Sequence, residues 1–368
     1  MLKQVVDNAV SKGLTFAICL LPGEQRARYF ISGNGRTHEP CVTTHGEGST
    51  TDSFVISPWL APWHNRITIE REVTPETFAE SVAATPGTCT PTETSTTVPQ
   101  ITRDEYLAAV SRVIESCRQR QGKTVFSRAI SSTMADGTTA GTVFDDLCRE
   151  FPQTFRFIFH TPETGLWLGA TPELLLDHDA ATRRCRVMSL AGTRPRTEGH
   201  TPWDDKNLRE NRFVTDFITD TFRTLGADAT TGPQQTLRYG RNIEHICHMI
   251  EATLPQGIVA AELIDRLNPT PALCGTPREA AIADITANEL HDRGCYGGAV
   301  GLVSTAAHAN IRLFVTLRCC HISGRTIRAF AGGGITPDSD PATEWRESSA
   351  KASFFTRHMR VLQNLAPA

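Results

Sequence analysis

The stretch AGGGITPDSDPATEWRESSAK (residues 331–351) runs from three consecutive glycines straight into a helix. We expect the glycines to break a strand and the helix to cover residues 342–362. On that helix Glu344, Glu347 and Lys351 are spaced i, i+3 and i+7, so they share one face. By themselves they predict only a solvated Glu347–Lys351 pair, worth roughly 0.3–0.5 kcal/mol.

The glycine run favours a binding role for this stretch. Three glycines between a strand and a helix let the backbone approach a ligand closely, and their N–H groups can bind an anion. Neither a Gly-Lys-Ser/Thr triplet nor a G-x-G-x-x-G frame accompanies the run. A nucleotide-binding loop is therefore excluded.

Hydrophobic periodicity predicts a mixture of strands and helices along the rest of the chain. Residues 1–69 are expected to form short strands, one of them over 14–22, and a Thr/Pro-rich stretch near 83–100 is expected to be a mobile connection. A capping box of Thr102 and Glu105 begins the first clear helix. Further helices are expected over 204–225, 258–267 and 278–289, strands over 123–130, 184–190, 297–304 and 310–322, and a hairpin over 155–170. Because regular βαβ alternation is missing, the pattern predicts a large mixed α/β (α+β) domain rather than a Rossmann or TIM fold.

The composition of the 368-residue chain excludes several classes of protein. Apolar residues make up 39% and charged residues 21%, with 37 basic and 40 acidic side chains and a formal charge of -3. This balance argues against a general nucleic-acid or anionic-membrane binder. No apolar run is long enough to span a bilayer, and no signal peptide is recognisable. The 11 cysteines include no C-x-x-C pair, which predicts free thiols in a reducing cytoplasm.

Glu210 is the first candidate for a functional carboxylate. Phe213, Val214 and Phe217 follow it at helical spacing, which places Glu210 on the buried face of the helix. A carboxylate in a core needs a cation, and only Lys206 shares this face. The simplest interpretation is a glutamate at the edge of the apolar stripe that pairs with Lys206 or reaches solvent.

Other candidates lie in or next to expected strands. Lys123 begins an expected strand, where a lysine can be desolvated, and Glu173 follows the turn GATP (169–172). Arg318, in the strand expected over 310–322, could bind a substrate carboxylate through two hydrogen bonds. An exposed lysine, an exposed glutamate and a structural ion pair remain alternatives for these three residues. His245 and His248 could share a helix face, but without a third ligand they do not predict a metal site.

Eight motifs occur in order between Thr102 and the C-terminus. They are KTVFSR (123–128), GATPEL (169–174), LAGTR (190–194), RENRFV (209–214), NPTPALCGTP (268–277), YGGAVG (296–301), AGGGI (331–335) and SDPATEWRE (339–347), the last followed by Lys351. In this order they resemble the motifs of the chorismate-utilising enzymes, and within them those of the isochorismate synthases. Residues 1–100 resemble the family more loosely. We expect them to form a strand-rich N-terminal part of the same fold, with residues 101–368 as the chorismate-binding catalytic region.

The resemblance implies a Mg²⁺-dependent enzyme that converts chorismate to isochorismate in one large domain of layered sheets and helices. It implies that Lys123 is the general base that activates water for attack at ring carbon 2, and that Glu173 is the general acid that protonates the departing 4-hydroxyl. The implied metal ligands are Glu210, Glu344 and Glu347. The implied substrate-binding positions are Gly192, His245, Ala272, Leu273, Tyr296, Arg318, Gly332 and Lys351.

The same resemblance limits the alternatives. Relatives that make aminodeoxychorismate by a covalent route carry a lysine where this chain has Ala191, and alanine cannot form that bond. The family often has histidine where Asn211 and Asn268 stand. No glutaminase subunit is expected, and the product is expected to feed menaquinone or siderophore biosynthesis in the cytoplasm. Salicylate synthesis, another chorismate reaction and a catalytically silent ligand-binding homologue remain the alternatives.

Overall fold

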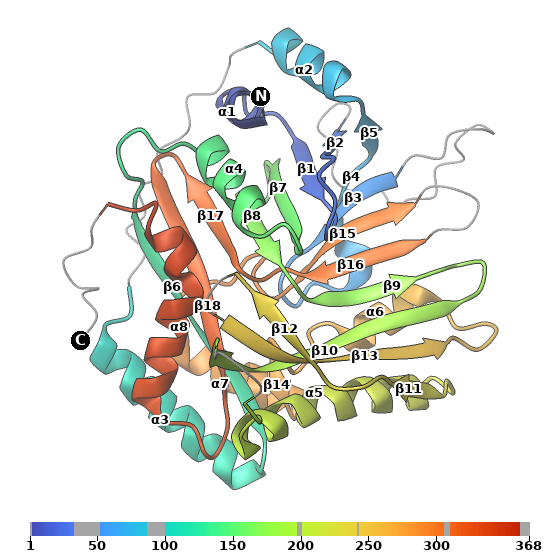
Figure 1. The fold of residues 1–368 in the computed structure, drawn as a ribbon, viewed down its shortest axis with the longest axis vertical. Helices are drawn as coiled ribbons and strands as arrows, with labels where there is room; N and C mark the ends of the chain where they lie inside the picture. Colours follow the sequence, from blue (N-terminus) through green and yellow to red (C-terminus); the bar gives the residue numbers. More distant parts are fainter. Residues whose placement is uncertain are drawn as a thin grey trace.

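The computed structural model describes residues 2–32, 52–86, 100–196, 201–240, 243–304 and 310–360. These residues form two nine-stranded sheets, with helices packed around them (Figure 1). The predicted mixed α/β architecture is therefore confirmed. Most of the connection predicted near 83–100 lies outside the described residues.

The strands pair in an antiparallel manner in both sheets. The first sheet consists, in spatial order, of β14 (Gly275–Thr276), β6 (Lys123–Thr133), β18 (Thr326–Ile335), β17 (Cys319–Ser323), β8 (Gly165–Thr171), β7 (Phe155–Thr161), β1 (Phe16–Leu20), β2 (Arg28–Ile31) and β5 (Arg71–Val73). The second consists of β11 (Ala229–Thr231), β13 (Ile243–Thr253), β10 (Arg184–Pro195), β9 (Leu174–His178), β16 (Ile311–Val315), β15 (Ala299–Ser304), β3 (Asp52–Ser57) and β4 (Ile67–Ile69), with β12 (Gln235–Tyr239) also paired to β13.

The helices cover the sheets where the candidate residues lie. α3 (Arg103–Arg120) and α8 (Pro341–Thr356) lie side by side and pack on β6 and β18, while α5 (Asp205–Thr224) packs on β10 and β13 (Figure 1). The remaining helical segments are α1 (Leu2–Ser11), η1 (Trp63–Asn65), α2 (Pro75–Ala84), α4 (Ala140–Glu150), α6 (Ala260–Leu267) and α7 (Arg278–Asn288). The capping box predicted at Thr102 and Glu105 is present at the start of α3.

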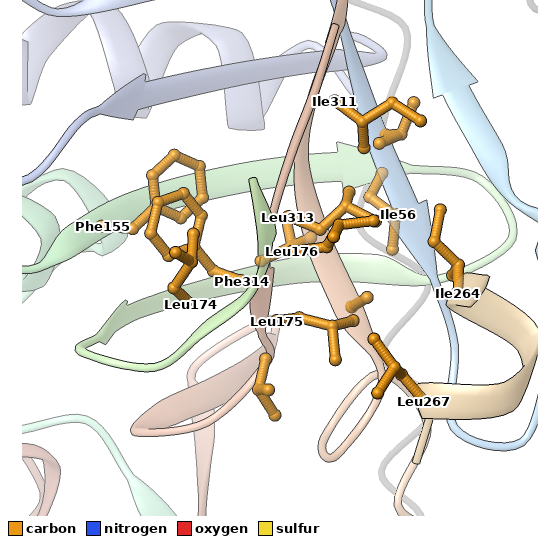
Figure 2. Close-up of a cluster of buried hydrophobic side chains, with 14 of the residues drawn as sticks. Ile56, Phe155, Leu174, Leu175, Leu176, Ile264, Leu267, Ile311, Leu313 and Phe314 are labelled. Atoms are coloured by element: carbon orange, nitrogen blue, oxygen red, sulfur yellow. The ribbon is translucent and has the colours of Figure 1, made fainter. Parts of the chain in front are cut away.

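The predicted elements with clear periodicity are confirmed. They are the strands at 14–22 and 123–130, the hairpin over 155–170, and the helices from 102, over 204–225, over 258–267 and over 278–289. The regularly spaced apolar residues of these elements pack into the buried hydrophobic core. Figure 2 shows part of this core, where Leu174, Leu175 and Leu176 of β9 and Ile311, Leu313 and Phe314 of β16 meet Ile56, Ile264 and Leu267. In the same cluster Phe155 stacks on Phe314, with ring centroids 4.3 Å apart.

Two strands continue where the sequence predicts their end, namely at the glycine run and after residue 190 of the strand expected over 184–190. The glycine run 332–334 lies inside β18, and residues 191–195 continue β10 through a bulge between Ala191 and Thr193. At the bulge Gly192 has φ +82°, and a Cβ on Gly192 would lie 2.9 Å from the backbone oxygen of Asn207. The glycines of β18 likewise allow neighbours to approach, since a Cβ on Gly334 would lie 2.0 Å from Glu210 Oε1. Glycine here therefore indicates close contact rather than the end of a strand.

Other predictions about local structure are wrong. The single strand expected over 310–322 is two strands, because the chain leaves β16 at Val315 and enters the other sheet at Cys319. The chain begins with helix α1 rather than a strand, and the last helix ends at Thr356 instead of residue 362. The segment with His245 and His248 is strand β13, not a helix, so the two side chains point to opposite faces of the sheet.

Candidate active site

A cavity between the two sheets collects the residues that the sequence motifs single out. It is lined by all eight predicted substrate-binding residues, namely Gly192, His245, Ala272, Leu273, Tyr296, Arg318, Gly332 and Lys351. Glu173 and Glu210 also line it, whereas Lys123, Glu344 and Glu347 each contact a residue of its lining, namely Glu210, Gly333 and Lys351. A larger cavity of about 1300 Å³ shares Thr193, Arg318 and Lys351 with it. The binding region therefore extends from a confined pocket into a wider space.

Lys123 is fully buried, which excludes the alternative of an exposed lysine. Its Nζ lies 3.0 Å from Glu210 Oε1, and the Lys123 side chain is 0% exposed. This pair corrects the interpretation that Glu210 pairs with Lys206 or reaches solvent. The buried cations lower the pKa of Glu210 against the opposing effect of its desolvation, and Lys123 is the strongest of them. Glu210 therefore holds a lysine amine in place at the edge of the cavity.

Glu173 is an isolated acid in the cavity wall, not an exposed turn residue. It lies between β8 and β9, where its backbone nitrogen donates to Thr171 Oγ1 and its backbone oxygen accepts from the nitrogen of Val315. The side chain is buried, and no hydrogen bond to Oε1 is found among the described residues. Burial raises the pKa of Glu173 to about 8, although Lys123 and Arg318 act in the opposite direction. Near neutral pH this carboxyl group keeps a proton that it can donate.

Arg318 lies in the connection between β16 and β17 and faces the cavity. Its backbone has φ +50°, a conformation that residues other than glycine rarely adopt. Nη2 lies 3.0 Å from His245 Nε2, and the guanidinium carbon lies 4.4 Å from the centre of the Tyr239 ring. Arg318 therefore presents a buried positive charge to the cavity.

Lys351 and Tyr296 line the cavity beside the glycines of β18. Lys351 Nζ donates to the backbone oxygen of Gly332 at 2.9 Å and lies 2.5 Å from Glu347 Oε1. The Tyr296 ring stacks on Phe330, and a Cβ on Gly332 would lie 3.0 Å from the Tyr296 hydroxyl. The predicted Glu347–Lys351 pair is thus present, but both side chains are largely buried rather than solvated.

The three predicted metal ligands lie against consecutive glycines of β18. A Cβ on Gly333 would lie 2.6 Å from Glu344 Oε2 and 3.8 Å from Glu347 Oε1, and Glu210 contacts Gly334. Each carboxylate is paired with a lysine. For Glu344, which is 1% exposed, that lysine is Lys206, with 2.8 Å between Nζ and Oε1. Within the described ranges no three His, Cys, Asp or Glu side chains lie close enough to hold a metal ion together.

The chemistry of these carboxylates nevertheless suits a hard cation. Desolvation, followed by the charge of Glu347, raises the pKa of Glu344, while Lys206 acts in the opposite direction. Two buried, mutually repelling carboxylates are a set of oxygen donors that Mg²⁺ prefers. The donor set therefore fits Mg²⁺, with the lysines as the present counter-ions.

Sequence reasoning overlooked two residues that support this site. Thr193 accompanies Gly192 in the quoted motif LAGTR, so its position in the motif could have identified it. Tyr239 carries no comparable signal, because it comes from the separate strand β12 and reaches Arg318 only through the fold.

Known proteins match this chain in sequence and in fold. The sequence profile of the family described as chorismate binding enzyme matches residues 56–360. The isochorismate synthase EntC of Escherichia coli K12 is 29% identical over 265 residues, which is 70% of this chain and 66% of that enzyme. The isochorismate synthase MenF of Bacillus subtilis is 28% identical over 265 residues, or 68% of this chain and 55% of that enzyme. These alignments thus span slightly more than half to about two thirds of the relatives' lengths.

Two solved structures share the fold. The menaquinone-specific isochorismate synthase MenF of Escherichia coli superimposes with a TM-score of 0.75 at 20% identity, over 97% of this chain and 91% of that chain. Anthranilate synthase component I of Streptococcus pneumoniae superimposes with a TM-score of 0.61 at 15% identity, over 92% and 90% of the two chains. At these identities the likeness concerns the fold alone. Among the described helices, none is long and apolar enough to cross a membrane.

Proposed function

Because the chain belongs to the family of chorismate binding enzymes, we propose that it converts chorismate to isochorismate. The observation that carries the proposal is Glu173, a buried carboxyl group with a pKa raised to about 8, in a cavity that also holds Arg318 and Lys351. Removing a hydroxyl group from a ring requires an acid that is protonated near neutral pH. Relatives named isochorismate synthase support the same reaction.

Lys123 and Glu173 divide the proton transfers in the proposed mechanism. Lys123, in its neutral amine form, accepts a proton from the water that attacks ring carbon 2, and Glu210, 3.0 Å away, orients the Lys123 side chain. Glu173 donates its proton to the departing 4-hydroxyl, which leaves as water. Burial of both side chains keeps bulk water away from these transfers. One water enters at carbon 2 and one leaves from carbon 4, so the reaction is an isomerisation.

The dicarboxylate substrate is held by cations and backbone groups of the cavity. Arg318 and Lys351 bind carboxylate oxygens, and the backbone at Gly192 and Gly332 approaches the ring because neither residue carries a side chain. Ala272, Leu273 and Tyr296 complete the wall on the apolar side of the ring.

Glu210, Glu344 and Glu347 are the proposed ligands of Mg²⁺. When bound, this ion supplies positive charge that stabilises the three carboxylates and a carboxylate of the substrate. In the absence of the ion, lysines balance the negative charges of these carboxylates through the Lys123–Glu210, Lys206–Glu344 and Lys351–Glu347 pairs.

The state of the cysteines agrees with the proposed cytoplasmic location. All described cysteines are free.

Product identification tests the proposal. The purified chain is incubated with chorismate, with and without Mg²⁺ and ammonia, and the products are separated by chromatography. We expect isochorismate, formed only with Mg²⁺ and without any need for ammonia or a glutaminase. Salicylate, anthranilate or unchanged chorismate under all conditions would contradict the proposal.

A further inference from the structure

We propose that His245 is a positioning residue that holds Arg318 as a neutral imidazole with its proton on Nδ1. The imidazole accepts a hydrogen bond from Arg318 and thereby aims the guanidinium at a carboxylate in the cavity. The part of this proposal that concerns the carboxylate rests on the proposed function, whereas the protonation state of His245 does not.

The hydrogen-bond geometry determines the tautomer. Arg318 Nη2 lies 3.0 Å from His245 Nε2, and a guanidinium has only donors. His245 Nε2 must therefore accept, which leaves the proton on Nδ1. Nδ1 lies 3.1 Å from Thr193 Oγ1, which can accept from it. The three side chains thus form one directed chain from Arg318 through His245 to Thr193.

The β-bulge places Thr193 at the end of this chain. Gly192 has φ +82°, and its conformation shifts the register between Ala191 and Thr193, so that Thr193 pairs with His245 on β13. The backbone nitrogen of Thr193 donates to Asn207 Oδ1 at 2.8 Å. Thr193 therefore links His245 to Asn207 of α5. The place of Thr193 in the strand depends in turn on the backbone conformation of Gly192.

Arg318 needs such a support because no carboxylate among the described residues forms an ion pair with it, although the charge of Glu347 acts on it from farther away. It is buried, it has no carboxylate within ion-pair distance in the described ranges, and its Nη1 has no hydrogen-bond partner there. Its contacts are the neutral imidazole and the face of Tyr239. A buried guanidinium held by neutral groups keeps its charge available for an anion.

The surroundings also keep His245 uncharged. Burial, followed by the charges of Arg318 and Lys351, lowers the pKa of His245 well below its usual range. Arg318 and Lys351 are the charged groups that face the imidazole. A neutral imidazole that already accepts at Nε2 and donates at Nδ1 has no proton to transfer to a substrate.

Nitrogen NMR tests the tautomer in the protein without substrate. The chain is labelled with ¹⁵N-histidine, and the His245→Gln variant identifies the His245 signals by their loss. We expect a protonated Nδ1, an unprotonated Nε2 and no titration of either signal between about pH 5.5 and pH 8.5. A proton on Nε2, or a titration within this range, would overturn the proposal whatever reaction the enzyme catalyses.

Kinetics with chorismate test the positioning role. His245→Met removes the acceptor at similar volume, so we expect KM to rise by about tenfold or more while kcat stays within about threefold. His245→Gln retains an oxygen that can accept from Arg318, and we expect it to restore KM to within about threefold of the parent. A loss of kcat in both variants with unchanged KM would assign proton transfer to His245 and contradict the positioning role.

His248→Met is the matched control. His248 lies on the same strand but on the opposite face, where its Nδ1 pairs with the backbone oxygen of Gly232 at 3.0 Å. We expect its KM and kcat to equal those of the parent protein, and thermal unfolding of all variants shows which of them remain folded. If His248→Met raised KM as much as His245→Met does, a general disturbance of β13 would explain the rise in KM, and the proposed role of the His245–Arg318 contact would be contradicted.

Discussion

Lys206 on α5 and Glu344 on α8 form a largely buried ion pair between two helices that come from distant parts of the chain, with 2.8 Å between Nζ and Oε1. Ser339 Oγ donates to the same oxygen at 2.8 Å. The pair therefore compensates a buried carboxylate that is also repelled by Glu347. Its energetic role can be measured separately from catalysis.

Lys206→Met removes this cation and leaves Glu344 buried. We expect the free energy of unfolding to fall by about 2 kcal/mol, because a buried carboxylate without its partner is costly and the hydrogen bond from Ser339 compensates only part of the loss. Added Mg²⁺ should reduce the difference, since Lys206 no longer competes with the ion for Glu344, so that the ion binds the variant more tightly and stabilises it more than the parent. Urea unfolding with and without Mg²⁺ measures both effects. Arg209→Met is the control, because Arg209, on the same helix as Lys206, pairs with Asp338 outside this helix, and both side chains are more than half exposed, so the pair should contribute less than about 0.5 kcal/mol.

The raised pKa of Glu173 predicts how stability depends on pH. The folded-state pKa of about 8 exceeds the ordinary value of 4.5, so the folded protein retains a proton that the unfolded chain loses. Stability is therefore lost as the pH rises from about 4.5 through about 8. Glu173→Gln lacks this ionisation, and its advantage in unfolding free energy should grow by up to about 1.4 kcal/mol per pH unit within that range. Urea unfolding at a series of pH values measures the difference, and a constant difference would contradict the assignment.

The same residue predicts the pH dependence of activity. We expect kcat/KM of the parent protein to decrease above about pH 8, where Glu173 loses the proton that the proposed mechanism uses. Glu173→Gln should have no measurable turnover at any pH although it folds. Initial rates with chorismate and Mg²⁺ test both statements. Activity that persists in Glu173→Gln would show that another group donates the proton.

Lys123→Met tests the proposed base. Removing a general base typically costs about 10²–10⁴ in rate, and we expect a loss in kcat of at least about 10³. The variant also leaves Glu210 without its 3.0 Å partner, so circular dichroism and thermal unfolding must accompany the rates. A folded Lys123→Met protein with more than a tenth of the parent kcat would refute the proposed role.

Glu347→Gln tests the proposed metal site with little change in shape. We expect the Mg²⁺ concentration for half-maximal activity to rise by about tenfold or more, because a neutral amide replaces a charged oxygen ligand. Calorimetric titration of Mg²⁺ into the protein should show the same loss of affinity without substrate. Glu115→Gln, on the exposed side of α3, serves as the control and should leave both values unchanged. Equal Mg²⁺ affinity in the parent protein and in Glu347→Gln would show that Glu347 is not a ligand of the ion.

Sequence reasoning succeeds where one periodicity dominates. The capping box of Thr102 and Glu105, the strand from Lys123 and the helix that carries Glu210 all follow from local patterns. The motifs also identify residues that the fold gathers in one cavity, including Gly192 and Tyr296. In each case the signal is contained within a short segment of chain.

Long-range relationships are what the sequence could not predict. Nothing near Lys206 indicates that it pairs with Glu344 rather than with Glu210, because the partner lies 138 residues away. The apolar residues on both sides of Arg318 give the pattern of a single strand, although they belong to two sheets. The glycines 332–334 look like a break because the side chains that require them come from other elements.

The described strands that precede residue 100 form one margin of each sheet. β1, with β2 and β5 beyond it, covers β7 in the first sheet, and β3, with β4 beyond it, covers β15 in the second. A fragment starting at residue 101 would therefore expose two long rows of unpaired backbone amides and carbonyls at once, an arrangement that promotes aggregation. The catalytic motifs alone would not make an autonomous unit, and a shortened chain of this kind should be recoverable only when the missing N-terminal segment is supplied alongside it.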